Sequence, residues 1–292
     1  MNVKKIIERL IIFFVGLPAV TAIVMFLPWY QNLAMNIAAT FLSGVGAMEL
    51  SSMLKKKNIN VTKVESFILG ILAPLAITLY VSFNFPNWIT ASFLMAGAGW
   101  GLLSGIFARR KSEMENTLNR VVGCFALLIY PGFFIYWLIR MNIWGDSFII
   151  LLFLLMAFSS DSIAWFFGTI LGKNNRGIIA VSPNKSIAGF IGGILGPILV
   201  ACAAAYFFPD TFYQASGSAF SSLLFPAILI GFCTGLAAIW GDLAESAIKR
   251  SCDFKDSGNF MLGRGGVLDS LDSIAAAAPV FYVLYYLFFI NT

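Results

Sequence analysis

The sequence predicts an all-α polytopic membrane protein with about nine transmembrane helices, a cytoplasmic N-terminus and a C-terminus outside. Three observations support this fold class. Of the 292 residues, 59% are hydrophobic and 11% are charged, whereas soluble domains average roughly 45–50% apolar and about 25% charged residues. The apolar residues form continuous runs of about 20, which suits membrane-spanning helices and not the alternating strands of a β-barrel. The third observation is the placement of the basic residues.

Nine apolar runs are long enough to cross a bilayer as helices. They lie near residues 8–28, 33–53, 66–84, 88–108, 121–140, 148–171, 187–208, 219–241 and 270–290. Merging or splitting neighbouring runs would change the count to eight or ten. The first run also resembles a cleaved signal peptide, but its removal would invert the orientation of every later segment.

The lysines and arginines determine the predicted orientation. If the N-terminus lies in the cytoplasm, all 19 Lys and Arg residues except Arg140 fall on the cytoplasmic side. Such an imbalance follows the positive-inside rule. We therefore expect an integral protein of a bacterial-type plasma (inner) membrane, with its charged loops in the cytoplasm. The net charge of +5 comes from basic residues spread over separate loops, a distribution that does not indicate nucleic-acid binding.

The residue inventory limits the chemistry that the chain can perform. It contains no histidine, which excludes a Ser-His-Asp triad, a histidine-ligated zinc and a phosphohistidine intermediate. Its four cysteines show no paired spacing, so buried thiols are expected instead of disulfides or a metal site. Acid, base or metal chemistry must therefore use carboxylates, lysines, hydroxyls or groups of the substrate.

The polar residues divide the chain into two regions. Residues 1–147 hold five of the apolar runs, and their loops carry basic residues typical of membrane-surface anchors. Residues 148–292 hold the other runs and the polar motifs, so we expect the catalytic region there. One motif is Asp161, about halfway along an apolar run among serines. It is either a functional carboxylate facing a polar cavity or a packing residue satisfied by those serines.

A second motif lies between two of these runs. Gly168 and Gly172 have the spacing of a close helix contact, and Lys173 follows them. The segment Ser182-Pro183-Asn184-Lys185-Ser186 then precedes a helix rich in glycine. A lysine and hydroxyls at a helix N-terminus can form an anion site. An ordinary Ser-Pro turn is the alternative interpretation.

The third motif, residues 241–273, holds six of the chain's fourteen carboxylates. Its residues suited to chemistry are Asp242, Glu245, Lys249, Arg250, Lys255, Gly263, Arg264, Gly265, Gly266, Asp269 and Asp272. On a continuing helix the first three share one face, although Glu245 and Lys249 alone would also suit a surface ion pair, and Asp269 and Asp272 alone would suit a helix N-terminus. Carboxylates that can hold a divalent cation thus flank a basic glycine loop that can hold phosphates. This pattern predicts chemistry on a phosphorylated substrate at the membrane surface.

Together the three motifs resemble those of the phosphatidate cytidylyltransferase (CDP-diacylglycerol synthase) family over roughly residues 159–275. The matching residues are Asp161, Ala164, Trp165, Gly168, Gly172, Lys173, Ser182, Pro183, Lys185, Ser186, Gly241, Asp242, Glu245, Ser246, Lys249, Arg250, Lys255, Asp256, Gly263, Gly265, Gly266, Leu268, Asp269, Asp272 and Ser273. The chain departs from the family at Leu262, Arg264 and Ser270, where the family has proline, histidine and arginine, and at Asn184 and Ala188, where lysine and glutamate are commoner. Arg264 keeps a cation in the loop but cannot act as a titrating acid, and it is placed to replace the cation lost at Ser270.

The resemblance implies a Mg²⁺-dependent nucleotidyltransferase that transfers the CMP moiety of CTP to phosphatidate in phospholipid biosynthesis, giving CDP-diacylglycerol and pyrophosphate. With that reaction, Asp242 and Asp269 are assigned to Mg²⁺, and Asp161, Glu245 and Asp272 are further catalytic carboxylates. The implied phosphate-binding residues are Lys173, Ser182, Lys185, Ser186, Lys249, Arg250, Lys255, Gly263, Arg264, Gly265 and Gly266. The expected partners are CTP, phosphatidate and membrane lipids, without nucleic acid. A second, monovalent cation, a homodimer and the acyl-chain preference are left open.

Two other functions fit parts of the pattern. A different lipid-linked nucleotidyl- or phosphotransferase, with an isoprenoid lipid as acceptor, would have a similar site. A secondary transporter of an anionic solute would use Asp161 as its coupling group, but it predicts intramembrane charges on several helices. In the predicted spans, Asp161 lies clearly within the membrane and the other motif charges lie at one surface.

Overall fold

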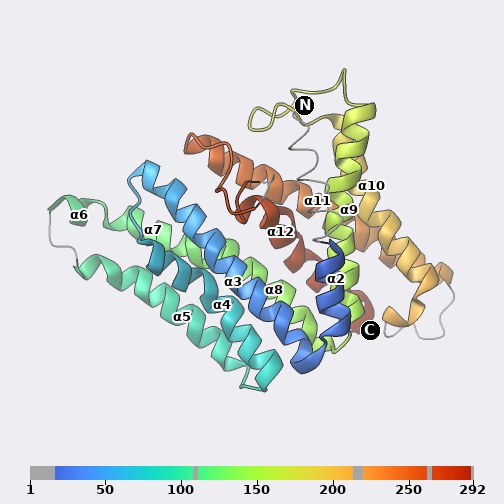
Figure 1. The fold of residues 1–292 in the computed structure, drawn as a ribbon, viewed down its shortest axis with the longest axis horizontal. Helices are drawn as coiled ribbons and strands as arrows, with labels where there is room; N and C mark the ends of the chain where they lie inside the picture. The colour runs from blue at the N-terminus through green and yellow to red at the C-terminus, as the bar shows by residue number, and fades with distance from the viewer. Residues whose placement is uncertain (1–16, 108–110, 213–219, 262–264, 291–292) are drawn as a thin grey trace. The chain divides into compact units, whose positions relative to one another are not determined.

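The computed structural model describes residues 17–107, 111–212, 220–261 and 265–290, and its regular elements in these ranges are helices (Figure 1). They are α2 (Leu17–Phe26), α3 (Trp29–Leu54), η2 (Lys55–Lys57), α4 (Lys63–Phe83), α5 (Trp88–Leu103), η3 (Ser104–Phe107), α6 (Lys111–Glu115), α7 (Thr117–Leu127), η4 (Leu128–Phe133), α8 (Phe134–Arg140), η5 (Met141–Trp144), α9 (Ser147–Ile170), α10 (Ile187–Phe207), η6 (Pro209–Thr211), α11 (Phe220–Ser251), α12 (Leu268–Tyr285) and η8 (Tyr286–Ile290). The all-α prediction is confirmed for the described residues. Isolated antiparallel bridges join Arg176 to Ser186 and Met261 to Gly265.

Eight helical segments in the described ranges are long and apolar enough to cross a membrane. They are Trp29–Lys57, Lys63–Phe83, Trp88–Ile106, Thr117–Trp144, Ser147–Ile170, Ile187–Phe207, Leu223–Ser251 and Leu268–Ile290. These segments match the second to ninth predicted spans. The predicted first span, 8–28, begins outside the described residues, and α2 is the part of it that the structure describes. The count of nine and the orientation of the termini therefore stay predictions.

Side chains at the helix starts explain several of the boundaries. Thr62 and Glu65 form a capping box at α4, in which each side chain bonds to the other residue's backbone N–H. Asp146 accepts a hydrogen bond from the N–H of Phe148 at α9, and Ser186 accepts one from Gly189 at α10. Such caps satisfy N–H groups that have no acceptor within the helix.

The chain divides into two compact units. Unit 1 comprises Met1–Gly145 and Ile248–Leu271, and unit 2 comprises Asp146–Ala247 and Asp272–Thr292. Helices α11 and α12 each contribute residues to both units. Unit 1 therefore includes a segment of the predicted catalytic region, 148–292.

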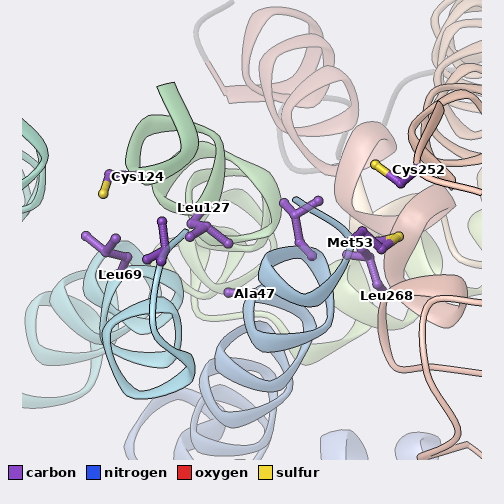
Figure 2. Close-up of a cluster of buried hydrophobic side chains, with 9 residues drawn as sticks. Ala47, Met53, Leu69, Cys124, Leu127, Cys252 and Leu268 are labelled. Carbon is purple, nitrogen blue, oxygen red and sulfur yellow. The ribbon is translucent and has the colours of Figure 1, made fainter. Parts of the chain in front are cut away.

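In unit 1, α3 packs along α4, which also contacts α5 and α8 (Figure 1). A cluster of buried apolar side chains holds this unit together (Figure 2). It consists of Ala47, Leu50, Met53, Val61, Leu69, Cys124, Leu127, Cys252 and Leu268. Because Cys252 and Leu268 flank the loop that joins α11 to α12, the cluster fixes both ends of this loop beside α3. The four cysteines are free thiols, as predicted; Cys124 and Cys252 are buried, whereas Cys202 and Cys233 are only half-buried.

Unit 1 also contains a network of buried amide side chains. Asn32 donates to Asn142 at 2.9 Å, and Asn142 donates to Asn36 at 2.9 Å. Asn36 in turn donates to the hydroxyl of Ser82 on α4 at 3.3 Å. All four side chains are buried. The network ties α3 to α4 and η5 inside candidate membrane spans, where an unsatisfied amide would be strongly disfavoured.

In unit 2, α9 packs along α10. A Cβ atom at Gly192 or Gly196 would lie 2.7 Å from the carbonyl oxygen of Ile163 or Ser159, so glycine permits this close approach. Ser160 adds a hydrogen bond to the Gly193 carbonyl oxygen at 2.8 Å. The helix that carries Asp161 is therefore held firmly in place within its unit.

Candidate active site

The predicted site residues fall into two groups, one in each unit. Unit 2 holds Asp161, Lys173, Ser182, Lys185, Ser186, Asp242, Glu245 and Asp272. Unit 1 holds Lys249, Arg250, Lys255, Gly265, Gly266 and Asp269. Gly263 and Arg264 lie outside the described residues.

Unit 2 gathers four carboxylates from three helices, here called the carboxylate cluster. Asp161 comes from α9, Asp242 and Glu245 come from α11, and Asp272 comes from α12. Glu245 and Asp272 are buried, with 0% and 6% of their surface exposed. The other three carboxylates lie close enough for their charges to repel that of Asp272. Asp161 and Asp242 are half-buried, so the cluster combines two buried carboxyl groups with two partly exposed ones.

The hydrogen bonds around Asp161 bear on its two interpretations. The hydroxyl of Ser159 donates to Met156 O, and that of Ser160 donates to Gly193 O. Asp161 instead accepts a hydrogen bond from Ser273 of α12 at 3.3 Å. The two serines before Asp161 thus serve the backbone, and the carboxylate reaches toward the start of α12, which favours a role in the cluster over a packing role.

Gly241 lets α11 approach α12 beside the cluster. A Cβ atom at this position would overlap the carbonyl oxygen of Asp272 and lie 2.6 Å from the Cβ of Ala276. Because real Cβ atoms do not come so close, glycine is required for this spacing of the two backbones. The approach brings Asp242, the next residue on α11, into the neighbourhood of Asp272.

Lys185 supplies a positive charge to the cluster. Its ammonium group forms an ion pair with Asp242 at 2.5 Å. The turn that presents it is closed by hydrogen bonds from Ser182 N to Ile179 O and from Lys185 N to Ser182 O, each 3.1 Å long. The predicted Ser-Pro loop therefore brings a lysine to a carboxylate of α11.

The remaining predicted residues of this loop have other surroundings. Ser186 caps α10, since its hydroxyl accepts a hydrogen bond from Gly189 N at 3.1 Å. The predicted close helix contact is found at Gly168 of α9, where a Cβ atom would lie 3.7 Å from Gly189 Cα of α10. Gly172 follows the end of α9, and a Cβ atom there would overlap the Ser186 side chain. Lys173 lies exposed at the surface.

The predicted residues of unit 1 centre on Asp269. Its Oδ1 atom pairs with the Lys249 ammonium group, and the two side chains are only 8% and 11% exposed. Its Oδ2 atom accepts hydrogen bonds from Ser257 N at 2.8 Å, from Ser257 Oγ at 2.9 Å and from Gly266 N at 2.7 Å. The Asp269 carboxylate thus joins the start of α12 to α11 and to the loop between the two helices.

The glycine loop has the backbone freedom that the sequence predicted. Gly265 has φ +102°, a conformation that L side chains rarely adopt, and it forms a bridge with Met261. The N–H of the following Gly266 points to Asp269 and not away from the protein. Arg250 and Lys255 are exposed.

Glu49 is a residue that the sequence analysis did not single out. It lies on α3, and its carboxylate accepts hydrogen bonds from Val267 N, Leu268 N and Ser257 Oγ at 2.9–3.0 Å. A signal was present in the sequence, because Glu49 is an acidic residue inside the predicted span 33–53. The reasoning that selected Asp161 applies to it equally.

The donor set of the carboxylate cluster fits a hard divalent cation. Mg²⁺ prefers carboxylate oxygens, and the cluster sets four carboxylates against the one lysine with which an ion pair is described. Within the described part of the chain, no three carboxylate or thiol side chains converge as a preformed metal site would require. Metal binding would therefore need movement of these side chains.

Comparison with known proteins supplies a further finding. The model of the Cytidylyltransferase family matches residues 7–288. The phosphatidate cytidylyltransferase of Haemophilus influenzae is 27% identical over 283 residues, covering 91% of this chain and 93% of its own length. That of Staphylococcus saprophyticus is 27% identical over 92% of this chain and 96% of its own length. That of Bacillus subtilis is 38% identical over 133 residues, which are 44% of each chain.

Proposed function

The chain belongs to the cytidylyltransferase family, and from this premise we propose that it transfers the CMP moiety of CTP to phosphatidate, forming CDP-diacylglycerol and pyrophosphate. The observation that carries the proposal is the family match over residues 7–288. Relatives named phosphatidate cytidylyltransferase cover more than nine tenths of the chain and support the choice of acceptor. A lipid acceptor in phospholipid biosynthesis also suits a chain with eight described helices able to cross a bilayer.

The reaction joins two anionic phosphates. An oxygen of the phosphatidate phosphate forms a bond to the α-phosphorus of CTP, while the bond from that phosphorus to the pyrophosphate oxygen breaks. A phosphate monoester is already ionised near neutral pH, so the attack needs no strong general base. This agrees with a chain that has no histidine. The protein's contribution is positioning and neutralisation of charge.

The proposed reaction is Mg²⁺-dependent, with Asp242 and Asp269 as the residues that bind the ion. Asp161, Glu245 and Asp272 would support it as neighbouring carboxylates. A bound Mg²⁺ supplies neutralisation of phosphate oxygens and polarisation of the phosphoryl group. The donor chemistry of the carboxylate cluster, to which Asp242 belongs and Asp269 does not, supports the assignment of Asp242. Whether a second, monovalent cation also takes part is left open. Turnover measured with Mg²⁺ in the presence and absence of monovalent cations would decide it.

Two of the proposed phosphate-binding lysines are paired with the proposed metal-binding carboxylates. Lys185 binds Asp242, and Lys249 binds Asp269. We propose that these lysines turn to the triphosphate or the lipid phosphate when substrates arrive, which frees the carboxylates. The other members of the proposed phosphate-binding set are Lys173, Ser182, Ser186, Arg250, Lys255, Gly263, Arg264, Gly265 and Gly266.

The proposed location is a bacterial-type plasma membrane, with the site facing the cytoplasm. The relatives come from bacteria, and CTP is a cytoplasmic substrate. The positive-inside distribution of the basic residues supports the same orientation. Mass measurement of the detergent-solubilised protein would decide between a monomer and a homodimer.

The test is turnover by the purified protein in detergent with α-³²P-labelled CTP, phosphatidate and Mg²⁺. We expect labelled CDP-diacylglycerol, no product without Mg²⁺, and no product from Asp242→Asn in a protein that remains folded. Asp253→Asn is the matched control, because Asp253 is an exposed carboxylate of the same segment and should keep full activity. Label transfer to an isoprenoid phosphate but not to phosphatidate would refute the acceptor. Normal turnover by Asp242→Asn would refute the metal assignment.

A further inference from the structure

Glu49 contacts the first turn of α12 from a different helix. Val267 occupies the position before this helix, since its carbonyl oxygen accepts the first helical hydrogen bonds, from Ser270 N and Leu271 N. The N–H groups of Val267 and Leu268 then have no acceptor within the helix. Both residues are 0% exposed, and valine has no side-chain oxygen with which to cap a helix. Glu49 Oε1 and Oε2 accept these two hydrogen bonds, at 3.0 and 2.9 Å.

The hydroxyl of Ser257 connects Glu49 to Asp269. Ser257 Oγ lies 2.9 Å from Glu49 Oε2 and 2.9 Å from Asp269 Oδ2. A hydroxyl carries one proton, so Ser257 donates to one of the two carboxylates at a time, and the acceptors compete for it. A change at Glu49 therefore alters the hydrogen bond between Ser257 and Asp269.

The packing around Glu49 leaves it little freedom to move. A Cβ atom at Gly258 or at Gly266 would overlap the Glu49 carboxylate. Leu268 belongs to the same buried apolar cluster as Ala47 and Leu50, which lie beside Glu49 on α3. The start of α12 is thus held to α3 by apolar contacts and by the Glu49 carboxylate. Gly258 and Gly266 leave the space that this carboxylate occupies.

We propose that Glu49 is a positioning residue for CMP transfer: its carboxylate caps α12 from α3, holds Ser257 and thereby sets where Asp269 lies. This inference rests on the proposed function, because it assigns Glu49 a role in that reaction through Asp269. Glu49 touches neither substrate in this account. Its effect is on the placement of the first turn of α12 and of the loop that precedes it.

The test compares Glu49→Gln with wild type in the full-length, detergent-solubilised protein. Glutamine has the same shape, but its NH₂ group cannot accept a hydrogen bond. Hydrogen–deuterium exchange of a peptide covering residues 266–271 should become about tenfold faster or more, because a buried N–H loses its acceptor. Peptides from α4 should exchange as in wild type. With CTP and phosphatidate, kcat should fall about 10- to 100-fold through misplacement of Asp269, while both KM values stay within about twofold.

A double-mutant cycle with Ser257→Ala sharpens the test. If both residues act through one hydrogen bond, the double variant should lose little more activity than the worse single variant. Ser52→Ala is the matched control on α3, because its hydroxyl bonds within its own helix to Met48 O at 2.9 Å. This control should leave exchange and turnover unchanged and should add independently to Glu49→Gln.

Three outcomes would overturn the proposal. Unchanged exchange at residues 266–271 would mean that Glu49 does not cap α12. Faster exchange in α4 as well would mean that Glu49 supports unit 1 generally. Local acceleration with unchanged kcat would mean that the cap has no role in the reaction. The proposed function fails separately, if wild-type protein transfers no CMP to phosphatidate, since the exchange measurement uses neither substrate.

Discussion

Removal of the Lys249 ammonium group should destabilise the protein measurably, because its partner Asp269 would stay charged and buried. The two side chains are 11% and 8% exposed, and breaking a buried ion pair typically costs about 3–5 kcal/mol. Asp269 Oδ2 keeps its hydrogen bonds from Ser257 and Gly266, whereas Oδ1 loses the lysine. We therefore expect Lys249→Met to lose about 3 kcal/mol, at the lower end of that range.

The double variant Lys249→Met with Asp269→Asn should recover most of this loss. The asparagine oxygen still accepts from Ser257 N and Gly266 N, and neither charge of the pair remains. We expect stability within about 1 kcal/mol of wild type and a coupling energy of about 2 kcal/mol or more. Activity should stay absent, because the proposed metal-binding carboxylate is gone. Recovery of stability without activity would show that the charged pair serves the reaction.

The assay is equilibrium unfolding in mixed micelles with increasing SDS, followed by far-ultraviolet circular dichroism. Lys255→Met is the control for loss of a lysine, because Lys255 is exposed in the same segment and should change stability by less than about 0.5 kcal/mol. If Lys249→Met unfolds like wild type, the ion pair does not stabilise the fold. If the double variant loses the sum of the two single effects, the residues are not coupled and the reasoning is wrong.

Three further predictions follow from the loop, the helix contact and the topology. Arg264→Lys should keep part of the activity. Arg264→Ala should lose charged hydrogen bonds worth roughly 1.5–3 kcal/mol, measured through the fall in kcat/KM. Full activity of the alanine variant would show that this side chain does not bind phosphate. Gly241→Ala should impair turnover, because the new methyl group would overlap α12, whereas Gly99→Ala meets no atom within 4 Å and should change nothing; equal turnover of the two would contradict the close approach. In a cysteine-free background, Asn174→Cys and Asn259→Cys should resist an impermeant thiol reagent in intact cells, whereas a cysteine appended to the C-terminus should react. Labelling of either loop from outside would overturn the orientation.

The membrane-spanning helices could be predicted from the sequence because each forms a continuous apolar run. Eight predicted spans correspond to helices, but the ends differ where a helix continues beyond the apolar run. The run 219–241 ends at the first charges, whereas α11 continues to Ser251. Alanine, glutamate, lysine and arginine there are good helix formers, so the helix extends although the hydropathy falls. The sequence pattern is consistent with this continuation, because a continuing helix places Asp242, Glu245 and Lys249 on one face.

The site could be predicted as a set of residue types, but its pairings could not. The charge pattern selected Asp161, Asp242 and Asp272, and the structure gathers these carboxylates in unit 2. Nothing in the sequence indicated that Lys185 pairs with Asp242 or that Glu49 bonds to residues more than 200 positions later. Such contacts depend on the rotation and height of one helix beside another, which side-chain packing sets and which hydropathy does not report.

The buried amide network has a consequence for how the protein is made. Asn142 bonds to Asn32 and Asn36, which precede it by 110 and 106 residues. Ribosomes add about 5–20 residues per second, so α3 is synthesised roughly 5–20 s before its partner on η5 exists. During that interval the insertion machinery must accommodate amides that hydrocarbon disfavours. The hydrogen bonds that join α3 to η5 can therefore form only after Met141–Trp144 has been synthesised, so the final packing of α3 is completed late.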